Sequence, residues 1–86
     1  MNRTERVSRD RGNMAEKALQ KAGYLTGTEK KGELDSDFLR DVASDFVADI
    51  LHLIQLHGGK IDEEGIVDKI IYGAKAAYAS DIGYKI

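Results

Sequence analysis

Apolar residues recur with helical spacing through the middle of the chain, and this stretch carries the strongest pattern. At about 100° per residue, one arc of roughly 140° collects eight apolar side chains: Leu39, Val42, Ala43, Phe46, Val47, Ile50, Leu53 and Ile54. Asp35 stands at the N-cap position, and Gly58 follows where a left-handed glycine would end a helix. The pattern predicts one long central helix between Asp35 and His57.

Two weaker patterns flank this helix. Asn13 and Glu16 approach a capping box at the start of a short, alanine-rich helix that Gly23 would end. Asp62 is placed to cap a third helix, whose apolar arc holds Ile66, Val67, Ile70, Ile71, Ala74, Ala77 and Tyr78. The short reversal at Gly58-Gly59-Lys60 favours antiparallel packing of the third helix on the central one. We therefore predict an all-α fold, a small bundle of three helices with the central helix antiparallel to the third.

Residues 1–12 are rich in arginine and contain one large apolar residue after the start, Val7. Such a segment buries too little surface to offset its ordering entropy, so we predict a mobile arm followed by a single helical domain, residues 13–86. The arm offers four candidate contacts to nucleic acid: Arg3, Arg6, Arg9 and Arg11. A solubilising tail is favoured over this role, because Glu5 and Asp10 dilute the charge and no aromatic residue is present for base stacking.

The polar side of the central helix is acidic at strict four-residue spacing. It carries Asp37, Asp41, Asp45 and Asp49, followed by His52. Like charges at this spacing destabilise a helix, and Arg40 is the one cation within it, so relief would come from the arginine arm, the lysines of the first helix or a partner. Successive carboxylates lie about 6 Å apart along the helix, a spacing comparable with that of phosphates along a nucleic acid. A surface of this kind could mimic a nucleic acid and occupy a basic groove of another protein, so these five residues are the candidate partner-binding surface. A plain solvated face is the favoured alternative, and a metal site from Asp45, Asp49 and His52 is geometrically possible but less favoured.

Composition narrows the function classes. The chain has 86 residues, enough for one domain, and no cysteine, which excludes a thiol nucleophile and fits a reducing compartment. Residues 1–31 hold eight Lys or Arg and four Asp or Glu, whereas residues 32–86 hold five Lys or Arg and eleven Asp or Glu. The N-terminal part of the chain is therefore basic and the remainder acidic. No nucleotide-binding or catalytic motif appears, and no apolar run reaches the roughly 20 residues of a membrane span. We expect a cytoplasmic protein without enzymatic activity, cofactor or metal.

The supply of apolar surface predicts self-association. The central and third helices offer more apolar side chains than the short first helix can cover, and several apolar residues fall outside the main arcs. The candidate contacts of a symmetric dimer are Leu51, Leu56, Tyr72, Ile82, Tyr84 and Ile86. The alternative is that the termini fold back over the excess and leave a monomer.

One resemblance rests on the run Asp45-Phe46-Val47-Ala48-Asp49-Ile50-Leu51-His52, then His57-Gly58, then Ala74 and Tyr78. These residues resemble small helical accessory proteins of prokaryotes and phages, and the resemblance implies no particular chemistry.

These observations together favour a small regulatory protein that binds a larger protein through the acidic side of the central helix. The competing interpretation is a nucleic-acid-binding accessory protein that uses the four arginines.

Overall fold

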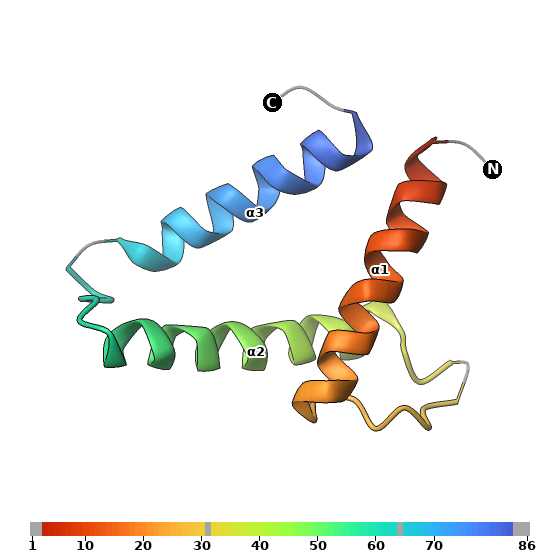
Figure 1. Ribbon diagram of the computed structural model, residues 1–86, viewed down its shortest axis with the longest axis horizontal. Helices are drawn as coiled ribbons and strands as arrows, with labels where there is room; N and C mark the ends of the chain where they lie inside the picture. Colours follow the sequence, from red (N-terminus) through yellow and green to blue (C-terminus); the bar gives the residue numbers. More distant parts are fainter. Residues whose placement is uncertain (1–2, 31, 64, 84–86) are drawn as a thin grey trace.

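Three helices account for most of the chain. The computed structural model describes residues 3–30, 32–63 and 65–83. Within them lie α1 (Arg3–Ala22), α2 (Ser36–Leu56) and α3 (Ile66–Ile82), and no strand is found in these ranges (Figure 1). The predicted all-α class and the number of helices are confirmed.

Both ends of α2 are closed by their own backbone and side chains. The Asp35 carboxylate accepts a hydrogen bond from the Phe38 amide at 2.8 Å, as its N-cap position predicts. At the other end the Gly58 amide donates to the Gln55 carbonyl and the Gly59 amide to the Ile54 carbonyl, at 3.1 and 3.0 Å. Gly58 has φ +93°, so the helix ends in the pattern of a left-handed glycine with two reversed hydrogen bonds. The predicted boundaries of the central helix are confirmed.

The first helix is twice as long as predicted. The mobile arm was expected over residues 1–12. Residues 3–12 instead form the first half of α1, and residues 1 and 2 lie outside the described residues. The Asn13–Glu16 pattern lies inside the helix instead of starting it. The segment contains no proline, and arginine is among the better helix formers. Val7 is half-buried where α1 meets the end of α3. The helix propensity of the segment and the burial of Val7 both favour a helix here, and the prediction considered neither.

The third helix also begins and ends elsewhere. Asp62 does not cap it, because residues 61–63 form a turn in which Lys60 and Glu63 pair at 3.7 Å. Gly65 precedes the helix with φ +62° and makes no side-chain cap. A residue in the left-handed region interrupts helical backbone, which explains the later start. The helix then continues to Ile82 and ends at Gly83, with φ +87°.

The helices are arranged as an open frame (Figure 1). α1 crosses the first half of α2, and α3 runs back from the far end of α2 toward the beginning of α1. α1 and α3 contact each other most extensively, whereas α3 diverges from α2. The predicted packing of α3 along α2 in antiparallel orientation is therefore not confirmed.

The core is small and divided between the crossing of α1 and α2 and the end of α3. Three apolar residues of the described chain are buried: Leu25, Val42 and Ala79. The connector after α1 contributes to it, since Tyr24 stacks on Phe46 with ring centroids 5.4 Å apart and planes 3° from parallel.

The molecule is flat and extended for its length. Its extents are 43 × 35 × 19 Å and its radius of gyration is 14.9 Å. A compact chain of this length has a radius of gyration of about 12 Å. Among the described residues, no helix has both the length and the apolar character to cross a membrane.

Candidate partner-binding surface

The acidic face of α2 consists of Asp37, Asp41, Asp45 and Asp49, all of them exposed. Because four residues advance slightly more than one helical turn, these carboxylates wind through a sector of about 120°. They occupy more than half of the helix length, and His52, also exposed, follows within the same sector. The structure thus brings together the five residues that the sequence assigned to partner binding.

Little positive charge of the molecule balances this face. Asp37 pairs with Arg40 at 3.1 Å, and both side chains are mostly exposed, so the pair contributes little to stability. Asp41, Asp45 and Asp49 make no ion pair with any residue that the structure describes. No cation within the described residues therefore offsets the repulsion among these three carboxylates.

The arginine arm does not supply that relief, because α1 packs on another side of α2. Ala15, Ala18 and Leu19 of α1 lie over four residues of the apolar arc of α2. That arc lies more than 100° around the helix from Asp41. The basic helix and the acidic face therefore remain separate surfaces.

An apolar residue stands at the end of the acidic face. Leu56 follows His52 by four residues, so the two side chains are neighbours on the helix surface. Leu56 is 83% exposed, and with His52 and Gln55 it lines a shallow hollow of about 590 Å³. Leu56 is predicted from the sequence to take part in self-association; in the structure it lies on the surface that holds the carboxylates.

The four arginines do not form one surface. Arg3 is the first residue of α1, and Arg6 and Arg9 follow at three-residue spacing with exposed side chains. Arg9 lies 3.6 Å from the carboxylate of Asp10. Arg11 is on a different side of α1, where it lines a hollow of about 300 Å³ between α1 and α3.

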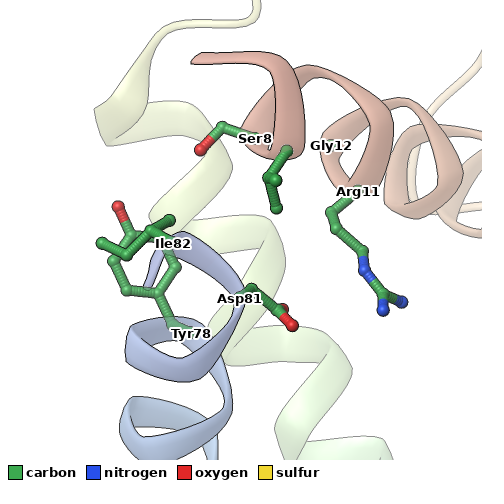
Figure 2. Close-up of a pocket in the computed structure, with 7 residues that line it drawn as sticks. Ser8, Arg11, Gly12, Tyr78, Asp81 and Ile82 are labelled. Carbon is green, nitrogen blue, oxygen red and sulfur yellow. The ribbon is translucent and has the colours of Figure 1, made fainter. Parts of the chain in front are cut away.

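Figure 2 shows that hollow, with α1 on one side and the last turn of α3 on the other. α1 contributes Ser8, Arg11 and Gly12, and α3 contributes Tyr78, Asp81 and Ile82. Ile82, a predicted self-association residue, is half-buried here within the chain.

The other predicted self-association residues are dispersed. Leu51 is half-buried and faces a hollow shared with Ile71 of α3, and Tyr72 is 70% exposed. Tyr84 and Ile86 lie outside the described residues. Sequence reasoning missed Leu53, which it placed in the core and which is 54% exposed. The signal for such a residue was that the apolar arc of the central helix is larger than the surface that the first helix can cover.

The structure gives no support to the alternative of a metal site on α2 within the described residues. No group of three or more His, Asp or Glu side chains within the described ranges is close enough to hold an ion. Asp45, Asp49 and His52 share a sector of α2 without converging on one point.

No protein-family model, curated protein or solved structure matches this chain. The resemblance to small accessory proteins of prokaryotes and phages stays a prediction.

Proposed function

We propose that this chain is a small, non-enzymatic interaction protein that binds a basic surface of a larger protein through the acidic face of α2. The observation that carries the proposal is that Asp41, Asp45 and Asp49 are exposed in a row and find no cation within the described residues. Repulsion along this row is relieved when a basic partner covers it.

The chemistry of the surface favours a protein as the partner. The aspartate carboxylates repeat at about 6 Å along α2, so a groove that accepts the phosphates of a nucleic acid would also accept these carboxylates. Leu56, at the end of the row, adds an exposed apolar side chain whose burial against a partner would be favourable. The partner we propose is a protein with a basic groove and an apolar pocket at one end of it.

The test uses affinity capture from the source cell with the full chain as bait. The variant with Asp41, Asp45 and Asp49 changed to Asn should lose a basic protein that the wild type retains. The matched control changes Glu33 to Gln and Asp62 and Asp68 to Asn, because these three residues are exposed and lie off the acidic face. Equal retention by wild type and the Asp-to-Asn variant, measured by quantitative mass spectrometry, would refute the proposal.

The order of the arginines supports a second candidate, binding of nucleic acid. Arg3, Arg6 and Arg9 recur every three residues on one helix, so their backbone positions lie within about 120° of one another. Titration with mixed DNA and RNA at two salt concentrations separates the candidates, because phosphate contacts make affinity fall steeply with salt. Micromolar, salt-sensitive binding that is lost when Arg6 and Arg9 become Gln would replace the first proposal with this one.

A further inference from the structure

The chain exposes more surface than a compact protein of its mass. Its accessible surface is 7078 Å². A compact monomer of 9.5 kDa would expose about 5,000 Å². About 2,000 Å² per chain is therefore in excess.

Part of the excess is an apolar groove that runs across α2. One hollow of about 280 Å³ lies between α1 and α2, and all seven residues that line it are apolar. A second, of about 360 Å³, lies between α2 and α3. Ala43 and Val47 line both hollows, so the two adjoin along α2, and together they are called the groove below.

The covering helix ends before the apolar arc does. α1 crosses the first half of α2, and the hollow beside it reaches from Ala43 to Ile50. Leu53 continues the same side of α2, seven residues beyond Phe46, and is 54% exposed. Across the groove, Val67 and Ile71 of α3 share one side of their helix and are 40% and 49% exposed. Apart from the crossing, the frame is one helix thick, whereas stable domains have two packed layers.

We propose that a second copy of this chain supplies the missing layer, with the groove around Val47 and Ile71 as the seam of a two-fold dimer. Covering the excess on both copies would bury about 4,000 Å² in total, within the range of roughly 2,000–5,000 Å² for obligate homodimers. A two-fold axis places the same groove and the same exposed side chains on both partners, so apolar residues of each copy can enter the groove of the other.

The charges separate this seam from the proposed partner-binding surface. Arg40, at one edge, is the single charged residue among those that line the groove. A basic partner therefore finds no complement there, whereas a second copy offers apolar surface of matching extent. The dimer does not rest on the proposed function, and both can hold because Asp37, Asp41 and Asp45 lie outside the groove.

The test is the mass of the full chain in solution by analytical ultracentrifugation. At tens of micromolar the wild type should sediment at about 19 kDa, twice the 9.5 kDa of one chain. Ile71→Glu should raise the dissociation constant by roughly a hundredfold, since it places a charge in the desolvated seam. Tyr72→Glu is the matched control, because Tyr72 neighbours Ile71, is more exposed, and does not line the groove.

Several results would overturn the proposal. A wild-type mass of 9.5 kDa at every concentration refutes the dimer. A dimer broken by Tyr72→Glu and not by Ile71→Glu places the seam on another side of α3. If Ile71→Glu loses its helical circular dichroism, Ile71→Ala decides instead, since it keeps the helix and removes only contact area; an unchanged dissociation constant then counts against the seam.

Discussion

The crossing of α1 and α2 and the space between α2 and α3 differ in how well the same helix is covered. At the crossing, Leu25 is 3% and Val42 7% exposed. Facing the other space, Ile71 remains 49% exposed although it is as apolar as either. The difference comes from the connections. The long connector after α1 brings Tyr24, Leu25 and Leu34 into the crossing. In the shorter connector after α2, Ile61 is the one large apolar residue among those that the structure describes, and it is half-buried.

The comparison teaches that a connector can act as a packing element. Thirteen residues between Ala22 and Ser36 allow the chain to turn and fill the angle between two helices. A corner that begins with two glycines reverses direction quickly and leaves the angle between its helices open. Closing that second angle requires side chains from elsewhere, which is the role we propose for a second copy.

The largest expected effect is at the closed crossing. Leu25→Ala removes the most buried side chain of the described residues and should lower the free energy of unfolding by about 2–4 kcal/mol. Urea denaturation at one fixed protein concentration measures the change. Leu56→Ala is the control, since Leu56 is 83% exposed and its loss should cost less than about 0.5 kcal/mol. Equal losses for the two variants would break the distinction between closed and open regions.

The next effect concerns the corner. A Cβ added at Gly59 would overlap the Ile54 side chain and lie 3.1 Å from the Ile54 carbonyl oxygen. Gly59→Ala should therefore destabilise the fold by about 1–3 kcal/mol, because the close approach must widen. The same urea experiment tests this, and a neutral result would mean that the corner opens without cost.

Gly73 distinguishes two possible seams on α3. No heavy atom lies within 4 Å of a Cβ built there, and the residue is inside the helix. Gly73→Ala should stabilise the chain by about 0.5–1 kcal/mol through helix propensity and leave the dimer dissociation constant unchanged. A weaker dimer in ultracentrifugation would move the seam to the side of α3 that holds Gly73.

The smallest effect depends on pH and lies in the connector that closes the crossing. The pKa of Glu29 is lowered chiefly because the Thr26 amide donates a hydrogen bond to its carboxylate, as does the Gly27 amide at 2.9 Å. A lowered pKa means that the charged form stabilises the folded connector above the ordinary pKa of 4.5, and that this stabilisation is lost as the pH falls through the folded value.

Glu29→Gln should therefore lower the melting temperature slightly at neutral pH and have a smaller effect in acid. Thermal unfolding of wild type and variant on both sides of the titration measures the difference. Glu33→Gln, in the same connector, is the control, because no hydrogen bond to its carboxylate is found among the described residues. A difference for Glu29→Gln that grows as the pH falls would contradict the reasoning.

The sequence predicted what local chemistry determines. Asp35, Gly23 and Gly58 mark helix ends whose hydrogen bonds form within a few residues, and the structure has them as predicted. The start of α1 at Arg3 was missed, because a helix of polar residues has no apolar period to detect. The start of α3 at Ile66 was missed, because Asp62 and Gly65 give competing signals that only the backbone angle resolves.

For the candidate surface, the exposure of the four carboxylates follows from their spacing and was predicted. The exposure of Leu53 was not, since it depends on where α1 crosses α2, and residue periodicity carries no information about crossing points. The place of Leu56 beside His52 could have been read from their four-residue separation.

The glycines after the three helices have a consequence for the order of folding. Gly23, Gly58 and Gly83 each adopt positive φ within two residues of the end of a helix, and each amide donates a hydrogen bond to a carbonyl of the last turn. Every helix thus carries its own terminator, so it can form on the submicrosecond scale of helix–coil relaxation before distant parts of the chain meet. Closing the tertiary structure is the slower event, and if it involves two copies, its rate rises with the amount of protein in the cell. The abundance of the chain would then set not only how much of it is assembled but how soon after synthesis it becomes resistant to proteases.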